Sequence, residues 1–199
     1  MSEADRLKWD ARFQAGSYES RTYPSPFLEE WLGQVPAASE DRRALDVGCG
    51  AGRNALRLAA AGYRVDAMDI SRHALARGAD SAAERSLSVN WIEADMDETV
   101  PEAGAYGFIS VVRFMNRAMP GRLIAALAPG GWLLFEHHLM TSRSVDGPRG
   151  DGFRLAPQEL LRTFAALRVI HYSEVIAEDP DGRSMALARL VACNGDPGF

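Results

Sequence analysis

The sequence has 199 residues, 47% of them hydrophobic and 25% charged, which are the proportions of an ordinary soluble globular protein. Its formal net charge of -5 argues against nucleic acid as the main partner, because binding phosphates requires a basic face. The two cysteines, Cys49 and Cys193, are too few for a disulfide framework and favour a reducing, cytoplasmic compartment. The charged first residues do not resemble a signal peptide, and no apolar run is long enough to span a bilayer.

We expect one domain over residues 1–199, with an N-terminal helical arm or flap (1–35) and a core (42–193). The arm is polar but carries too many aromatic residues for a disordered tail. Trp9 and Phe13 are four residues apart, so a short helix would place both on one face. Two interpretations stay open, namely an arm that packs on the domain and a flap that covers the ligand site.

Strands and helices alternate along the core. Ser25 and Pro26 are typical of a capped helix start. We expect strands at 42–47, 63–70, 88–93, 106–113 and 132–138, and helices at 52–61, 71–85, 118–128 and 157–166. This alternation predicts an α/β fold, in which a Rossmann-like, doubly wound sheet is mostly parallel and covered by helices on both faces.

The end of the chain departs from this alternation. Residues 178–182 join two expected strands, and so short a connection allows only an antiparallel hairpin. The last strand, about 184–192, therefore enters the sheet in reverse. Residues 140–156 form a long irregular loop, and such loops are often functional. Its arginines at 143, 149 and 154 lead to the hypothesis that it attracts an anionic substrate.

A glycine-rich turn, residues 48–52, follows the first expected strand. Gly48, Gly50 and Gly52 allow a tight turn and the close approach of a ligand to the backbone. The helix that follows directs free N–H groups at one spot, which indicates a nucleotide-type site. A dinucleotide fingerprint would need glycine at position 53, where Arg53 stands. A P-loop is excluded because no Gly-Lys-Ser/Thr follows the turn.

The turn, written Leu45-Asp46-Val47-Gly48-Cys49-Gly50-Ala51-Gly52-Arg53-Asn54, resembles the first motif of class I S-adenosylmethionine (SAM)-dependent methyltransferases. Further segments are similar to later features of that family: Asp69-Ile70-Ser71, Ala94-Asp95-Met96, Leu127-Ala128-Pro129-Gly130-Gly131 and the terminal hairpin. The resemblance spans roughly residues 42–192. Within the family, Gly52-Arg53-Asn54, Phe114-Met115-Asn116-Arg117 and residues 153–161 resemble the tellurite-resistance-type small-molecule methyltransferases. Gly107 departs from the family pattern, which often has an acid there.

The resemblance implies SAM as cofactor and gives roles to particular residues. Asp69 would hold the ribose and Asp95 the adenine amino group, and both would otherwise be solvated loop acids. The full set that we expect to bind the cofactor is Asp46, Gly48, Cys49, Gly50, Asn54, Asp69, Ile70, Asp95, Met96 and Arg113. Of these, Asp46 would orient the turn, Ile70 and Met96 would flank the adenine or fill the core, and Asn54 would reach the methionine moiety. Arg113 would face the methyl group or form a surface salt bridge.

No catalytic residue is assigned. His137 and His138 are the available bases, and adjacent strand residues point to opposite faces, so at most one would face the site. No metal site is expected, because no cluster has ligand spacing. We expect a methyltransferase for a small-molecule acceptor such as a thiol or a chalcogen anion, which needs no general base. The alternatives are a SAM-binding sensor or partner domain without transfer activity and an NAD(P)-dependent enzyme.

Overall fold

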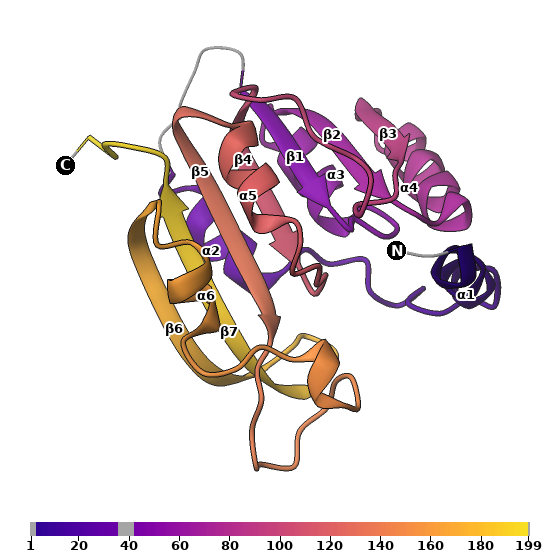
Figure 1. The fold of residues 1–199 in the computed structure, drawn as a ribbon. Helices are drawn as coiled ribbons and strands as arrows, with labels where there is room; N and C mark the ends of the chain where they lie inside the picture. Colours follow the sequence, from indigo (N-terminus) through magenta and orange to yellow (C-terminus); the bar gives the residue numbers. More distant parts are fainter. Residues whose placement is uncertain (1–2, 36–41, 199) are drawn as a thin grey trace.

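The computed structural model describes residues 3–35 and 42–198. Its centre is a seven-stranded sheet with the order β3-β2-β1-β4-β5-β7-β6 (Figure 1). The strands are β1 (Arg43–Val47), β2 (Arg64–Asp69), β3 (Val89–Glu93), β4 (Tyr106–Val112), β5 (Leu127–His138), β6 (Arg168–Glu178) and β7 (Ser184–Cys193). β7 runs antiparallel to both β5 and β6, so the expected reversed last strand is confirmed.

Helices cover both faces of the sheet, as a doubly wound fold requires. On one face, α2 (Pro26–Leu32), α3 (Arg53–Ala60) and α4 (Arg72–Glu84) contribute to a core around Phe27, Leu58 and Phe108. On the other face, α5 (Pro120–Ala126) and α6 (Glu159–Thr163) pack on Ile109 and Phe135. The predicted α/β fold class is therefore confirmed.

The strand order reverses between β1 and β4. The chain proceeds outward from β1 to β2 and β3, returns to β4 on the other side of β1, and continues to β5. In open parallel sheets, ligands bind beyond the carboxyl ends of the strands at such a switch point. The glycine turn after β1 and the residues after β4 meet at this place.

Several element boundaries differ from those expected. Helix α5 ends at Ala126, and β5 begins at Leu127 rather than at Trp132. Its pairing with β4 is irregular, because Tyr106 pairs with Leu127 whereas Phe108 pairs with Trp132. The Pro-Gly-Gly segment thus forms a bulge inside the strand. Helix α6 is also shorter than the expected 157–166, at Glu159–Thr163.

The N-terminal arm contains α1 (Glu3–Gln14), whose Trp9 and Phe13 share one face as expected. Both rings contact Tyr18, with centroids 6.5 and 5.6 Å away. The expected domain range also includes residues 1–2, 36–41 and 199, which lie outside the described residues. Over the part that is described, no helix has the length and apolarity needed to cross a membrane.

Candidate functional site

The glycine turn adopts a backbone that side chains would disturb. Gly48, Gly50 and Gly52 have φ of 64°, 56° and 78°, in the left-handed region that glycine accepts without strain. A Cβ on Gly48 would lie 2.4 Å from Cγ of Phe114, and one on Gly52 would lie 2.2 Å from the ring of Trp91. The turn therefore requires glycine for conformation and for space.

Asp69, at the end of β2, fastens this turn. Its carboxylate accepts hydrogen bonds from the backbone N–H of Gly50 at 2.8 Å and of Ser71 at 2.9 Å. Burial raises the pKa of Asp69, whereas these N–H donors act to lower it. Each carboxylate oxygen has a second acceptor site, so Asp69 retains the capacity to accept from ribose hydroxyls. Ser71 caps α4, because its hydroxyl accepts from Ala74 N at 3.2 Å.

The N-terminal arm reaches the same place. The Ser71 hydroxyl donates to Asp10 at 2.7 Å, and Phe13 would lie 3.3 Å from a Cβ on Gly50. The arm therefore packs on the domain and also covers part of the glycine turn, so the two interpretations of the sequence are not exclusive.

Asp46 lies beneath the turn and is 1% exposed. The hydroxyl of Ser110 donates to it at 2.6 Å, and its other oxygen has no hydrogen-bond partner among the described residues. Burial raises the pKa of Asp46 to about 7, against the effect of Ser110. This position suits the expected role of supporting the turn from below.

Asn54 and Arg53, in the first turn of α3, contact the arm. The side-chain oxygen of Asn54 accepts from the backbone N–H of Ser25 at 2.9 Å. Arg53 donates to the carbonyl of Tyr23 at 3.4 Å, and burial lowers its pKa. The Ser25 hydroxyl does not cap α2, contrary to the expectation from sequence. It donates instead to Glu136 at 3.2 Å.

The other residues expected to bind the cofactor differ in burial, from the partly exposed Asp95 to the buried Ile70, Met96 and Cys49. The Asp95 carboxylate, after β3, accepts from the backbone N–H of Asp97 at 2.8 Å. Ile70 is buried beside Asp69, and Met96 is buried in the core under α5. Cys49 packs in the opposite core, on the side of α2 and α3, and burial raises the pKa of its thiol.

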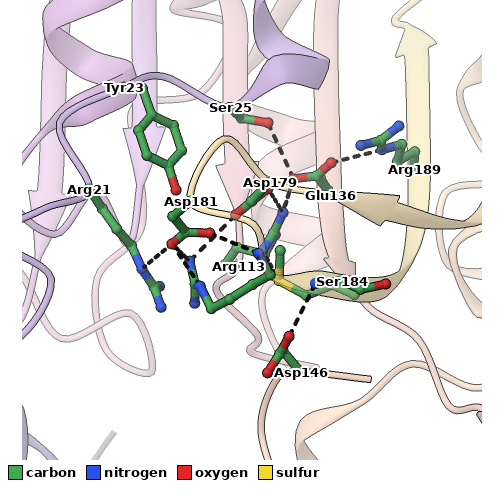
Figure 2. Close-up of polar contacts among 12 residues, drawn as sticks. Arg21, Tyr23, Ser25, Arg113, Glu136, Asp146, Asp179, Asp181, Ser184 and Arg189 are labelled. Carbon is green, nitrogen blue, oxygen red and sulfur yellow. Dashed lines mark hydrogen bonds and ion pairs between the residues drawn. The ribbon is translucent and has the colours of Figure 1, made fainter. Parts of the chain in front are cut away.

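Arg113 follows β4 and forms a buried ion network (Figure 2). Its guanidinium lies 3.0 Å from Glu136 and 3.1 Å from Asp179 and donates to the sulfur of Met185 at 2.8 Å. The Arg113 side chain is 12% exposed. The surface salt bridge considered from sequence is therefore a buried one.

Glu136 is the centre of the network and is fully buried. Besides Arg113 and Ser25, it accepts from Arg189 of β7 at 2.8 Å. The network continues through Asp179 to Arg183 at 3.6 Å, and Arg183 also pairs with Asp181. The sequence interpretation missed Glu136, Asp179 and Arg189. The available signal for Glu136 was a single acid between the apolar run Trp132–Phe135 and the two histidines.

His137 and His138 end β5, where its antiparallel pairing with β7 is regular, and their ring centroids lie 5.6 Å apart. His137 Nε2 lies 3.1 Å from the carbonyl of Phe153. Burial, with a further contribution from the positive charge of Arg113, lowers the pKa of His137 to about 4 and that of His138 to about 3. Both rings are therefore neutral near pH 7.

The 140–156 loop is held by its own residues. Arg154 donates to the carbonyls of Leu139 at 2.9 Å and Pro148 at 3.1 Å, so it serves the loop's structure, whereas Arg143 and Arg149 are exposed. Arg117 donates to the carbonyls of Gly152 and Arg154 at 3.0 and 2.8 Å. These contacts tie the loop to the segment that follows β4.

A pocket of about 210 Å³ opens between the β4–α5 connection, β5 and α6. Its apolar lining comprises Met115, Pro120, Phe135, Leu155, Leu160 and Phe164. Arg117 and Glu159 also line it and pair at 2.8 Å. Elsewhere in the described residues, no group of three or more His, Cys, Asp or Glu side chains has the arrangement of a metal site.

Comparison with known proteins relates this geometry to enzymes. A model of the methyltransferase domain matches residues 44–131. The chain is similar to the ubiquinone biosynthesis O-methyltransferase of Burkholderia orbicola (strain MC0-3), with 34% identity over 181 residues, 76% of this chain and 78% of that protein. The enzyme of the same name from Bordetella avium (strain 197N) is 28% identical over 117 residues, and the match spans 56% of this chain and 48% of that protein.

Solved structures share the fold. TehB from Haemophilus influenzae superposes with a TM-score of 0.72 at 22% identity, covering 93% of this chain and 66% of that chain. The geranyl diphosphate C-methyltransferase from Streptomyces coelicolor A3(2), in complex with S-adenosyl-L-homocysteine, gives a TM-score of 0.66 at 16% identity and covers 83% and 74%. With a switch-point glycine turn and this degree of likeness to a methyltransferase along most of its length, the chain belongs to the class I SAM-dependent methyltransferases, enzymes whose cofactor is S-adenosylmethionine.

Proposed function

We propose that this enzyme methylates a small-molecule acceptor whose nucleophile arrives already ionised, such as a thiolate or a chalcogen anion. The observation that carries this proposal is the state of the titratable groups around Arg113, in β5 and directly after β6. Glu136 and Asp179 are committed to Arg113, and His137 and His138 have pKa values lowered to about 4 and 3. Such weak bases deprotonate a hydroxyl or an ammonium inefficiently, whereas a thiolate or selenide-type anion needs no base.

The cofactor would be held by the residues around the glycine turn. Because Gly48 and Gly50 have no Cβ, the rings of Phe114 and Phe13 lie directly against the turn and would flank a bound cofactor. The Asp69 carboxylate has acceptor capacity left for the ribose. Asp95 would meet the adenine with Ile70 beside it, whereas the Met96 side chain fills the core. Cys49 and Asn54 would contribute through the backbone of the turn and the first turn of α3. Asp46 would support the turn, and Arg113 would act through the charge it places below the transfer site.

Bound SAM supplies an electrophilic methyl group, and the cofactor carries that chemistry. The chain's own contribution is to hold the acceptor in line with the methyl group and to exclude water. The arm, through Phe13 above Gly50, and the 140–156 loop, through its contacts with Arg117, would serve this purpose. The exposed Arg143 and Arg149 favour the approach of an anion.

The acceptor's apolar body would enter the pocket beside Met115 and Phe135. Its volume of about 210 Å³ is below the roughly 300–1,000 Å³ of sites for drug-sized ligands, which suits a small molecule. We further propose that residues 1–199 act as one domain and that the enzyme works in the cytoplasm, where its two free, buried cysteines stay reduced.

A hydroxyl acceptor is the second candidate, because the matched relatives are named O-methyltransferases. The two candidates differ in pH dependence. A phenol needs a base, so its methylation would rise with pH as the phenol itself ionises, near pH 10. A selenide or a thiol of low pKa would already react fully near pH 7.

The test is product formation from SAM with a panel of thiols, selenite or tellurite, phenols and amines, followed by mass spectrometry at pH 7 and pH 9. Turnover of the soft nucleophiles at pH 7 in preference to phenols supports the proposal. Preferred turnover of phenols replaces it with the hydroxyl candidate. Micromolar SAM binding without turnover of any acceptor would indicate a binding domain instead.

A further inference from the structure

Phe114 lies against the glycine turn at the switch point of the sheet, where open parallel sheets place their ligand crevice. It follows Arg113 at the end of β4, is half-buried, and lies so close to the glycine turn that a Cβ on Gly48 would be 2.4 to 2.5 Å from three of its carbon atoms. Because Gly48 directly follows β1 and Phe114 follows β4, the ring lies between the ends of the two strands at which the strand order reverses. Phe114 packs against the core on the side of α5 and α6, and among the described residues it forms none of the aromatic pairs or cation–π contacts seen elsewhere in the chain, such as those of Phe13.

The covalent structure of SAM would bring its sulfonium charge close to the Phe114 ring. The inference rests on the proposed cofactor site, with the ribose at Asp69. In SAM, the sulfonium sulfur is two bonds from the ribose ring, so a ribose at the end of β2 leaves the sulfur within reach of the β1–β4 crevice. An aromatic ring at that crevice therefore meets the sulfonium and its methyl group.

The carboxylates near the switch point are engaged within the chain, and Asp46 is buried beneath the turn, where it accepts from Ser110. The Asp69 carboxylate is engaged with Gly50 and Ser71, and Glu136 and Asp179 are paired with Arg113. A cation at van der Waals distance from an aromatic face is attracted by the ring's quadrupole, most strongly where water is excluded. We propose that Phe114 contacts the sulfonium through a cation–π interaction and so makes the site prefer charged SAM over its neutral thioether product, S-adenosylhomocysteine.

Phe13 provides the matched comparison. It also lies against the glycine turn, 3.3 Å from a Cβ on Gly50, but its ring is already in contact with other groups. Arg77 lies 5.7 Å from its centroid, and Tyr18 lies 5.6 Å away. Removing the Phe13 ring would therefore change packing above the turn without removing the attraction for a sulfonium.

The experiment is calorimetric titration of SAM and of S-adenosylhomocysteine into the full-length protein and three variants, Phe114→Leu, Phe114→Tyr and Phe13→Leu. Leucine keeps the apolar bulk of Phe114 but removes the quadrupole, whereas tyrosine keeps the ring. We expect Phe114→Leu to weaken SAM about three- to tenfold more than S-adenosylhomocysteine. Phe114→Tyr retains the wild-type ratio of the two dissociation constants, and Phe13→Leu leaves that ratio unchanged.

Equal weakening of both ligands by Phe114→Leu would overturn the inference, because it would show that the ring contributes packing alone. A changed ratio in Phe13→Leu of the same size would overturn it as well. If the wild-type protein bound neither ligand, the cofactor site itself would be wrong and the inference would fall with it. That failure is distinguishable, because the first two outcomes require measurable binding.

Discussion

The two halves of the carboxyl edge of the sheet are built in different ways. Beyond β1 and β2, the site consists of backbone, with glycines in left-handed conformations and one carboxylate, Asp69, that accepts two N–H groups. Beyond β4 and β5, it consists of buried ions, with Glu136 between Arg113 and Arg189. The first half is thus held by backbone conformation, and the second is an internally neutralised network of buried ions.

The largest loss of stability is expected from a change in the buried ion network of the second half. In Glu136→Gln, Arg113 loses one of its two carboxylate partners and Arg189 loses its partner, while both stay away from water. Removing one member of a buried ionic group costs about 3–5 kcal/mol, so we expect a loss of that size in the free energy of unfolding, measured by urea denaturation.

Glu29→Gln is the control, because it breaks the Arg57–Glu29 pair, whose side chains are 35% and 40% exposed. Exposed pairs contribute about 0–1 kcal/mol. Equal losses in the two variants would contradict the description of the β4–β5 half as a buried ion network.

The next largest loss of stability is expected from a change in the backbone of the glycine turn. In Gly48→Ala, the new Cβ meets Phe114, and alanine at a left-handed φ costs roughly 1–2 kcal/mol. We expect a stability loss of about 2–3 kcal/mol, since the displaced ring adds to that strain, together with loss of measurable SAM binding.

Gly121→Ala is the matched control. Gly121 lies in α5, and nothing lies within 4 Å of the position of a Cβ there. Alanine at that helical position stabilises by about 0.5–1 kcal/mol and leaves SAM binding unchanged. Unaltered SAM binding by Gly48→Ala would show that the turn is not the cofactor site.

The two halves also respond to pH in opposite directions. His137 has a pKa of about 4 in the folded protein, below its usual value near 6.5, so its stabilisation is complete above pH 6.5 and is lost as pH falls toward 4. Asp46 has a pKa of about 7, above its usual value near 3.9. Its burial therefore lowers the free energy of unfolding by an increasing amount as pH rises from 4 to 7.

Denaturation of His137→Gln and Asp46→Asn beside the wild type, at pH 5 and pH 7, separates these effects. The stability of the wild type relative to His137→Gln falls by about 2 kcal/mol from pH 7 to pH 5. Relative to Asp46→Asn, it rises by a similar amount over the same change. A difference that does not vary with pH, for either variant, would mean that the group titrates in the folded protein as it does in the unfolded chain.

The sequence predicts the first half well and the second poorly, for a physical reason. Backbone requirements leave local marks, because a turn that needs left-handed residues selects glycine at 48, 50 and 52, and a strand that ends at the site carries Asp69. The buried ion network depends on contacts between residues far apart in the chain, such as Ser25 with Glu136 and Arg113 with Asp179. Local sequence patterns contain no information about such pairs. The hydrogen bond to Glu136 also explains why the Ser25 hydroxyl does not cap α2, although its position before Pro26 predicted a cap.

The central claim is that SAM binds at the β1–β2 half and not on the buried ion network. Its most direct test is calorimetric titration of SAM into the wild type, Asp69→Asn and Asp179→Asn. We predict micromolar binding by the wild type, weakening of about tenfold or more in Asp69→Asn through loss of charge-assisted hydrogen bonds, and affinity within about threefold of wild type in Asp179→Asn. Unchanged affinity in Asp69→Asn, or a larger loss in Asp179→Asn, would contradict the account.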